Sequence, residues 1–573
     1  MPTLDWIGKS KVVNHHLDVP YCVLDRKYSF DENGYLEEDN GSDNMVIHGD
    51  NLIALKSLLP QYENGIDCIY IDPPYNTGKK EGQWIYSDNV DDPIIKKWIG
   101  EVVGAEGDDL SRHDKWLCMM YPRLRLLHRC LSKRGVIFIS IDDNELASLK
   151  IICDEIFGSS NYIGILSVEI NPKGRKNSAF VSQSNDYCLI YAKHKLDVAF
   201  IENIPKDKKD LAIDENGRLV HNSGKRVLVG ENSFNNVVSD FKSKKHYSVY
   251  YNEDNGDFVT IKEESIDAVN VELINAGYKR YISSNEGVFV ENTYSEDKIL
   301  ELFEEDALDF KNKKIYEKNF STKIRIKSIV TNKKYKTYDE EGNVIDYQID
   351  VKTTSAGTEL KNIFKTDKTV FPNPKNRFFI SLLISLLNYE NMVVLDSFAG
   401  SGTTAHAILD LNKNSKKSNR FILIEMGEYA DTITAERIKR VIAGYKSKKK
   451  FVEGIGGNFS YYELGEPLMK DGLLNETVGE DKICEYVYFT ETKQKISHGN
   501  EDEPYFLGQY AGNAYYFYYH KDSLTTLDRE FLHTVKRKSE GYVIYADLCT
   551  LSTRELERYH ITFKKIPRDI SRL

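Results

Sequence analysis

The stretch 69–75, Ile-Tyr-Ile-Asp-Pro-Pro-Tyr, constrains this chain more than any other. The run 68–71 is short and apolar, which is typical of a buried strand. Pro73 and Pro74 can continue neither a sheet ladder nor a helix, so the chain must leave the strand at Asp72 with a fixed shape. Because ligands bind at the carboxyl ends of strands in open α/β sheets, a site is expected here.

The groups after this strand suit a flat ring that carries an amino group. The carboxylate of Asp72 and the carbonyl of Pro73 can accept its two N–H bonds, and Tyr75 can stack on its face. We therefore predict a catalytic loop made of Asp72, Pro73, Pro74 and Tyr75. A plain turn is the alternative for an Asp-Pro sequence, but a glycine-rich motif downstream favours a functional site.

The residues around this loop predict an α/β sheet. A strand over 45–51 and a helix over 51–59, ended by Pro60, precede it, so Asp50 also lies at a strand end and either caps the helix or contacts a ligand. Residues 76–107 are rich in glycine, as in loops that close over substrate. The further expected elements are helices over 116–130 and 145–157 and strands over 135–142 and 184–192.

A second motif, over residues 392–404, predicts a strand, a glycine-rich turn and a helix. Gly400 and Gly402 let the backbone approach a ligand and free the N-terminus of the helix that begins near Thr404. Glu425 ends the next strand, and an acid about 20 residues after such a turn can accept both hydroxyls of a ribose. A dinucleotide site is the alternative because the turn fits G-x-G-x-x-A, whereas the Gly-Lys-Ser/Thr of a phosphate loop is missing.

The alternation of strand and helix patterns is lost between residues 196 and 345, where short charged runs are rich in tyrosine, lysine and asparagine. Basic residues next to Tyr247, Tyr250 and Tyr251 suit a DNA backbone and its bases. An ordinary solvated surface is the alternative, because acidic stretches such as 301–309 lie between them. The candidate DNA-binding residues are Lys242, Lys244, Lys245, Lys323, Arg325, Lys327, Lys333, Lys334 and Lys336.

Composition sets outer bounds. A chain of 573 residues is too long for a single domain. Because the net charge is −11, any DNA binding must depend on local clusters of lysine and arginine. Eight cysteines without Cys-x-x-Cys pairs argue against zinc, and we predict no metal. The sequence shows no apolar run long enough to span a membrane and no signal-peptide core, so the cytoplasm is the expected compartment.

Together, these motifs resemble the β-class DNA adenine-N6 methyltransferases, and in particular the modification (Mod) subunits of type III restriction–modification systems. The segments that match are 48–51, 70–78, 371–375 and 396–404, and Glu425 falls where the family has its ribose acid. The target-base motif precedes the cofactor motif, as in that family. The resemblance implies an α/β, Rossmann-like sheet, circularly permuted, in which the two loops meet at one edge of a single sheet.

The resemblance also implies a reaction: transfer of a methyl group from S-adenosyl-L-methionine to N6 of a flipped-out adenine at specific sites in duplex DNA. Asp rather than Ser before Pro-Pro-Tyr favours adenine over cytosine N4 in such families. The cofactor-binding residues implied are Asp50, Asp72, Phe371, Asn373, Lys375, Asp396, Phe398, Gly400, Gly402, Thr403 and Glu425.

We expect five parts: an N-terminal arm (1–44), two parts of a methyltransferase core (45–195 and 346–450), a target-recognition domain between them (196–345), and a small α+β C-terminal domain for dimerisation or partner contact (451–573). The implied partners are double-stranded DNA, a second copy of the chain and a helicase–nuclease (Res) restriction subunit. The alternatives are a nucleotide-dependent oxidoreductase, a DNA-recognition chain without catalysis, and a solitary type II-like methyltransferase.

Overall fold

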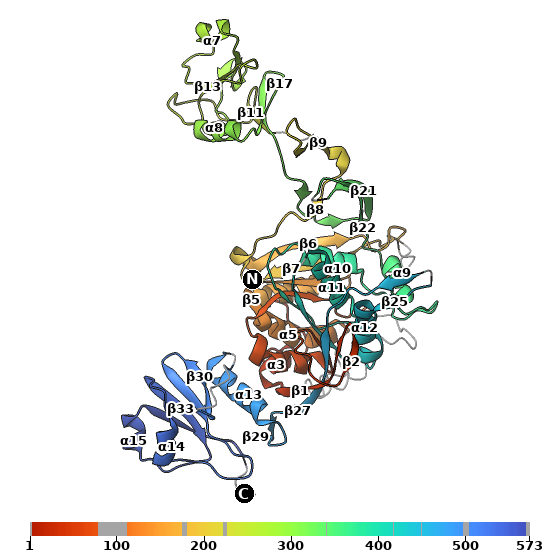
Figure 1. Cartoon of the computed structure of the whole chain (residues 1–573), viewed down its shortest axis with the longest axis vertical. Helices are drawn as coiled ribbons and strands as arrows, with labels where there is room; N and C mark the ends of the chain where they lie inside the picture. The colour runs from red at the N-terminus through yellow and green to blue at the C-terminus, as the bar shows by residue number, and fades with distance from the viewer. Residues whose placement is uncertain are drawn as a thin grey trace. The chain divides into compact units, whose positions relative to one another are not determined.

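The computed structural model describes residues 3–77, 112–174, 180–221, 226–339, 341–415, 417–448, 450–494, 496 and 503–568. The chain forms two compact units (Figure 1). Unit 1 contains Met1–Ile201, Lys327–Lys333 and Ile349–Leu573, and unit 2 contains Glu202–Ile326 and Lys334–Gln348.

A mixed sheet organises unit 1. Its strands, in spatial order, are β2 (Gly34–Leu36), β1 (Cys22–Asp31), β27 (Phe459–Pro467), β3 (Met45–His48), β24 (Arg420–Glu425), β23 (Val393–Asp396), β4 (Ile66–Ile71), β5 (Leu131–Ile141), β7 (Asp186–Ala192), β6 (Tyr162–Val168) and β20 (Ile329–Val330). Neighbours are parallel from β27 to β5, whereas β7 runs antiparallel to both β5 and β6.

Two distant parts of the sequence interleave in this sheet. Strand β24 lies between β3 and β23, and β23 pairs with β4 so that Leu395 is opposite Ile69. Every residue of β4 and β23 is buried, as expected for parallel strands covered on both faces. Because the two strands are parallel, their carboxyl ends lie at the same edge, and the prediction that the two loops meet there is confirmed.

Helices cover this sheet. They are α1 (Lys9–Val12), α2 (His15–Asp18), α3 (Asn51–Tyr62), α5 (Arg112–Cys130), α6 (Leu146–Phe157), α9 (Thr353–Ile363), α10 (Arg377–Ile384), α11 (Thr403–Ser415) and α12 (Glu436–Ala443). Helices α3, α5 and α6 pack together in a core that includes Ile69 and Ile71 of β4. Since side chains alternate along a strand, the buried Cys68 and Tyr70 face the other way, and both faces of the sheet are covered.

The structure differs from the sequence-based expectation near the N-terminus. Residues 1–44 are not an irregular arm, because they contain two short helices and the ten-residue strand β1, which pairs with β27. Helix α3 continues past Pro60 to Tyr62, since a proline removes only its own N–H bond and the N–H of Glu63 still reaches the carbonyl of Leu59. The loop expected over 76–107 lies, after Thr77, outside the described residues.

In its described residues, unit 2 is built from short strands and the short α-helices α7 and α8. They are β8 (Ile204–Pro205), β9 (Leu211–Ile213), β10 (Leu219–His221), β11 (Val227–Val229), β12 (Ser248–Tyr251), β13 (Phe258–Ile261), α7 (Val271–Asn275), β14 (Lys279–Tyr281), β15 (Ser284–Asn285), β16 (Val288–Phe289), α8 (Glu296–Glu304), β17 (Leu308–Lys311), β18 (Lys314–Glu317), β19 (Lys323–Ile324), β21 (Lys333–Tyr338) and β22 (Val344–Ile349). The expected block 196–345 is interrupted, because β20 leaves it and pairs with β6 in the sheet of unit 1.

Tyrosines of unit 2 form its core. Tyr247 packs in a cluster with Val249 and Ile299, and the buried Tyr250 donates its hydroxyl hydrogen bond to Glu263. The ring of Tyr251 stacks on Phe310 at 4.0 Å between centroids. The expectation that these rings stack on bases is therefore wrong for Tyr247 and Tyr250, because both are occupied inside the unit.

The remaining elements are β25 and β26, which precede β27 in the chain, and the elements that follow β27. They are β25 (Gly444–Lys446), β26 (Phe451–Glu453), β28 (Met469–Lys470), β29 (Leu473–Leu474), α13 (Glu480–Thr492), β30 (Phe506–Tyr510), β31 (Asn513–Phe517), β32 (Thr526–Leu527), α14 (Arg529–Thr534), β33 (Gly541–Ala546), β34 (Leu548–Cys549), α15 (Thr553–Arg558) and β35 (Ile561–Lys565). Strands β30, β31, β33 and β35 form a separate sheet. The structure differs from the expected boundary at 451, because β27 belongs to the central sheet.

Candidate active site

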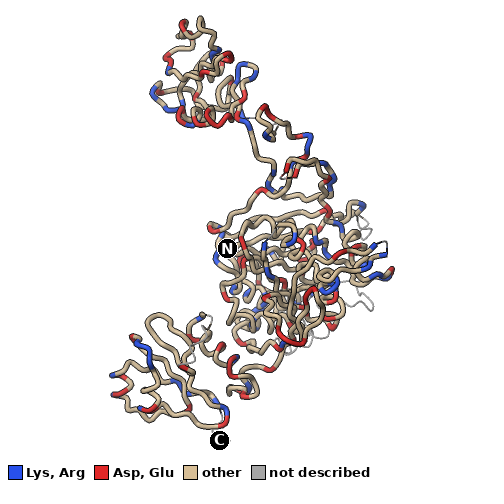
Figure 2. Tube along the Cα trace, in the orientation of Figure 1, with Lys and Arg blue, Asp and Glu red and all other residues tan. Residues whose placement is uncertain are grey.

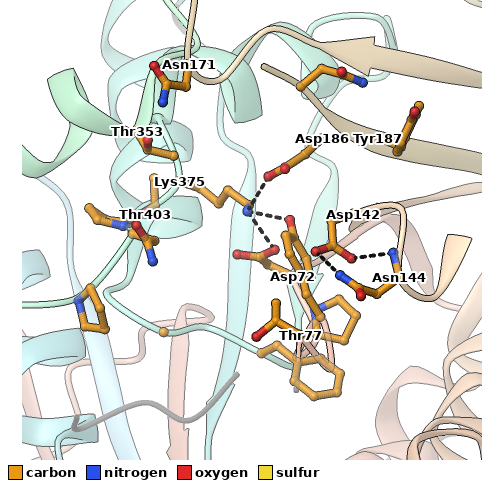
Figure 3. A pocket seen from close by; sticks show the side chains of 18 of the residues that line it. Asp72, Thr77, Asp142, Asn144, Asn171, Asp186, Tyr187, Thr353, Lys375 and Thr403 are labelled. Atoms are coloured by element: carbon orange, nitrogen blue, oxygen red, sulfur yellow. Dashed lines mark hydrogen bonds and ion pairs between the residues drawn. The ribbon is translucent and has the colours of Figure 1, made fainter. Parts of the chain in front are cut away.

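A cavity of about 1090 Å³ lies in unit 1, at the edge where β4 and β23 end. Figure 3 shows side chains that converge on it from separate parts of the sequence, among them Asp72, Asp186, Lys375 and Thr403. The walls come from the residues after β4, β5 and β23, from the start of β7 and from the segment 371–375. The cavity therefore requires both interleaved parts of the sheet.

The loop after β4 is held from two sides. The indole N–H of Trp116 donates to the carbonyl of Pro74 at 2.7 Å. Asn76 adopts a left-handed conformation with φ 58°, and its amide donates to the buried carboxylate of Glu145. These contacts fix the backbone on both sides of Tyr75, whose ring is 8% exposed and lines the cavity.

Among the described residues, Lys375 is the basic side chain that lines this cavity. Its Nζ lies 3.0 Å from Oδ1 of Asp72 and 3.8 Å from Oδ2 of Asp186. It also donates to the hydroxyl of Tyr75 at 2.5 Å and lies 4.6 Å from the centroid of that ring. Since Asn373 has φ 45° and Pro372 and Pro374 restrict the backbone around it, the segment 371–375 aims this lysine at the loop after β4.

Burial shapes the charges in the cavity. It raises the pKa of Asp72, and the ammonium of Lys375 partly offsets that rise. Burial also raises the pKa of Tyr75 well above 10, so its phenol stays protonated at neutral pH. Burial raises the pKa of Asp396 to about 7 and that of Asp142 to about 6, although hydrogen bonds to each carboxylate oppose the rise.

The glycine-rich turn after β23 is tightly bonded. Oδ2 of Asp396 accepts from the hydroxyl of Thr404 at 2.5 Å, and Oδ1 accepts from the N–H of Phe398 at 3.0 Å. The buried Arg437 of α12 donates to the hydroxyl of Thr403 at 2.7 Å. The backbone at Gly400 has φ 52°, and a Cβ there would lie 3.3 Å from the ring of Phe371. The turn thus presents bare backbone to the cavity beside an aromatic ring.

The structure sorts the residues predicted from the sequence. Ten of them line the cavity: Asp72, Pro73, Tyr75, Phe371, Asn373, Lys375, Asp396, Phe398, Gly400 and Thr403. Pro74, Asp50, Gly402 and Glu425 are not in its wall. Asp50 caps α3, because its carboxylate accepts from the N–H groups of Leu52 and Ile53.

Glu425 lies behind the glycine turn. Its carboxylate is buried and accepts from the N–H of Gly400 at 2.7 Å, the N–H of Gly427 at 2.9 Å and the hydroxyl of Tyr429 at 2.9 Å. Burial raises the pKa of Glu425, and these donors oppose the rise. In this structure the residue holds the turn in place.

Several cavity residues were not identified from the sequence. Chief among them is Asp186, whose side chain is 5% exposed and faces Lys375. Because β7 is antiparallel to β5, with Tyr187 opposite Ile141, the start of β7 lies at the edge where β5 ends. A buried acid at the head of the apolar run 186–192 was the available signal. The others include Asp142, Asn144, Asn171, Gln183 and Thr353.

The nine candidate DNA-binding residues are exposed and lie on both units. Figure 2 shows that basic and acidic residues alternate along the chain in both units. Lys244 pairs with Asp297 at 3.2 Å. Within the described residues, the six basic side chains between 323 and 336 make no ion pair.

Two features are absent from the described residues. In the described ranges, no group of three or more His, Cys, Asp or Glu side chains could hold a metal ion. In the same part of the chain, no helix is both long and apolar enough to cross a membrane.

The conformation of Gly402 gives a test of the turn. Its φ is 73°, and a Cβ there would lie 2.8 Å from the carbonyl oxygen of Thr434. We expect Gly402→Ala to lower the free energy of unfolding by at least about 1–2 kcal/mol, measured by denaturant unfolding. Gly357→Ala is the matched control, because its Cβ would meet nothing within 4 Å inside α9 and should stabilise that helix. Similar changes from both variants would contradict the strain at Gly402.

Comparison with known proteins places this site in a family. The model of the DNA methylase family N6_N4_Mtase matches residues 66–436, more than half of the chain. The chain is 31% identical over 443 residues to the type III restriction-modification enzyme EcoPI Mod subunit of Escherichia phage P1, covering 74% of this chain and 64% of that one. It is 29% identical over 403 residues to the type II methyltransferase M.KpnI of Klebsiella pneumoniae, covering 70% and 84%.

A solved structure, that of the M1.HpyAVI–SAM complex, aligns with 69% of this chain and 99% of its own at 14% identity and a TM-score of 0.27. The chain spans about 64% of the length of two of the type III Mod subunits that it matches. The matched region, 66–436, includes both the loop after β4 and the glycine-rich turn after β23. The chain belongs to the N6/N4 DNA methylase family.

Proposed function

We propose that this chain transfers a methyl group from S-adenosylmethionine to N6 of a flipped-out adenine in duplex DNA, as the modification subunit of a type III restriction–modification system. One observation carries the proposal: the loop Asp72–Tyr75 and the turn around Gly400 follow neighbouring parallel strands and line one cavity. A methyl acceptor on one loop and a methyl donor on the other would then be close enough to react.

On the acceptor side, the chain supplies oxygen acceptors and an aromatic face. Asp72 and the carbonyl of Pro73 would accept the N–H bonds of the target amino group and draw its lone pair out of the ring. Stacking on Tyr75 would return about 1–3 kcal/mol of the few kcal/mol that flipping a base costs. The pinning of this loop by Trp116 and Glu145 supports a preorganised site, which is where most of the rate gain would arise.

On the donor side, the residues present fit S-adenosylmethionine. Because Gly400 has no Cβ, the space beside the ring of Phe371 stays open for a ligand. Asp396, Ser401 and Thr403, with a carboxylate and two hydroxyls, line the same part of the cavity. We propose that these residues hold the cofactor, together with Asn373 and Phe398. When bound, the cofactor supplies an activated methyl group. Asp50, Gly402 and Glu425 would act by shaping the turn and its neighbouring helix.

The choice of base and system is part of the proposal. The type III Mod subunits among the relatives support the type III assignment. Adenine N6 is supported by Asp72, rather than a serine, before Pro73-Pro74-Tyr75. M.KpnI, a type II methyltransferase, keeps a solitary enzyme as the second candidate. Family membership favours methyl transfer over the oxidoreductase and the non-catalytic alternatives.

We further propose a circularly permuted Rossmann-like core, because β4 with the target loop precedes β23 with the glycine turn in the chain and neighbours it in the sheet. The region 196–345 would be the target-recognition domain, and 451–573 would bind a second copy of the chain. By analogy with the relatives, a helicase–nuclease (Res) subunit is the proposed restriction partner.

Identification of the product tests the reaction. We expect the chain to label unmodified duplex DNA with radioactive methyl from S-adenosylmethionine, and nucleoside mass spectrometry to find N6-methyladenine. N4-methylcytosine in its place would overturn the base assignment alone, whereas absence of any label would overturn the reaction. Sequencing that detects methylated adenines would then give the recognition site.

Substitution of Asp72 tests the division of roles. We expect Asp72→Ala to reduce methyl transfer by at least about 100-fold, because the target amino group loses a preorganised acceptor. Binding of S-adenosylmethionine, measured by calorimetry, should change little. Gly400→Val is the counterpart, since its side chain would collide with Phe371 and weaken cofactor binding. Equal loss of cofactor binding in both variants would contradict this division.

Paired lysine substitutions test the DNA-binding surface. Lys334 and Lys336 are exposed on β21, and we expect their joint replacement by alanine to weaken DNA binding and to reduce its salt dependence. The slope of log K against log[salt] should fall by about 0.9 for each phosphate that the variant no longer neutralises. Lys311→Ala with Lys313→Ala is the matched control, because both are exposed in unit 2 but lie outside the candidate set. An unchanged slope in the first pair would remove β21 from the interface.

A further inference from the structure

The ammonium group of Lys375 lies where the proposed function needs the amino group of the target. It is within 3.0 Å of Asp72, the proposed acceptor of that amino group, and 4.6 Å from the centre of the Tyr75 ring, the proposed stacking surface. It also donates to the hydroxyl of Tyr75. The lysine and the incoming base would therefore compete for the same two side chains.

A second carboxylate stands beside this ammonium. Figure 3 shows Nζ of Lys375 between Asp72 and Asp186, joined to each by a dashed line. Oδ2 of Asp186 is 3.8 Å away, which is an ion pair but longer than a hydrogen bond. Asp186 is more deeply buried than Asp72, with side chains 5% and 25% exposed. A small movement of the flexible lysine stem would exchange the nearer partner for the farther one.

We propose that Lys375 is a gate with two partners: it pairs with Asp72 while the position of the target base is empty, and it moves to Asp186 when the base comes in. This inference rests on the proposed function. Asp186 is then a positioning residue, which acts through Lys375 and does not touch the substrate.

Electrostatics explains why two carboxylates are needed. An ammonium group that loses its partner inside a protein is strongly destabilised, so a gate with one partner would oppose base flipping. With Asp186 in reach, the cation stays paired in both positions. While Lys375 pairs with Asp72, it also stabilises the ionised form of that carboxyl group, which burial disfavours. The lysine thus favours the charged form of the carboxylate that the amino group meets.

The groups that face Asp72 can be distinguished by their charge. Burial raises the pKa of Tyr70, Tyr75 and Cys188, so these three are neutral near pH 7. Among the described residues, the charged groups include Lys375, Asp186 and, above their pKa values of about 7 and 6, Asp396 on β23 and Asp142 after β5 (Figure 3). Lys375 favours the ionised form of Asp72 and Asp186 disfavours it, so removing each should shift the titration of Asp72 in opposite directions.

The pH dependence of methyl transfer tests the gate. A protonated Asp72 is a weaker acceptor for the N–H bond that the proposed function assigns to it, so the rate of methyl transfer falls as the pH falls through the pKa of Asp72. We call the part of the pH–rate profile where the rate falls at low pH the acid limb. We expect Lys375→Met to move the midpoint of this acid limb up by about 1 pH unit or more, because the neighbouring cation is lost. Asp186→Asn should move it down, because a like charge beside Asp72 is removed.

Two variants serve as controls. Lys375→Arg keeps the charge and should hold the acid limb near that of the unchanged protein. Lys9→Met removes a comparable half-buried pair, Lys9 with Glu155 at 2.9 Å, and should leave the limb in place. Side chains in the two pairs have similar exposure, 17% and 27% against 13% and 25%. The binding of S-adenosylmethionine by Asp186→Asn, followed by calorimetry, should stay unchanged.

Opposite shifts in Lys375→Met and Asp186→Asn are required by the charges beside Asp72. The gate requires in addition that Asp186→Asn raise the KM for duplex DNA, because Lys375 then has no second carboxylate to move to, and an unchanged KM for DNA overturns it. Shifts in the same direction, or a shift no larger than that of Lys9→Met, overturn it while leaving the proposed function in place. If Lys375→Met does not fold, as judged by circular dichroism, Asp186→Asn alone decides, since an upward or absent shift contradicts the gate. Absence of methyl transfer by the unchanged protein removes the proposed function and the gate with it.

Discussion

The parallel pairing of β4 with β23 is the contact on which the rest of this structure depends. It joins residues more than 300 positions apart and leaves both strand ends at one edge. Asp72 follows one strand and Asp396 ends the other, and Asp72 lies close enough to add to the rise that burial causes in the pKa of Asp396. Such a concentration of acid is tolerable only with Lys375, Thr404 and backbone N–H groups as partners.

Around that pairing, the protein uses rigid parts on each side of the cavity. Trp116 and Glu145 fix the loop after β4, while Arg437 and Glu425 fix the turn after β23 from behind. None of these four residues lines the cavity. They place the residues that do, which is the usual division between a functional surface and the shell that supports it.

The sequence predicted the strand and loop at 68–75 and the strand and turn at 392–404 because each motif is local: apolar runs, prolines and glycines fix their own backbone. Ten of the fourteen predicted loop and cofactor residues line the cavity. Asp186 was not predicted as a cavity residue because its position depends on the direction of β7, which the order of elements does not determine. Strand β1 was not predicted because its residues are mostly half-exposed and form no clear apolar run. The partners of Glu425 depend on how the turn packs, which no local pattern reveals.

The interleaving of the sheet has a consequence during synthesis. Strands β3 and β4 leave the ribosome hundreds of residues before β23 and β24, which fill the space between them. Until then, β4 has β5 on one side and an open row of backbone N–H and C=O groups on the other. While unit 2 is synthesised, the open edge of β4 must not pair with strands of other chains. The cavity is thus completed late in synthesis, and a nascent chain cut short before residue 393 carries the loop after β4 without the strand beside it.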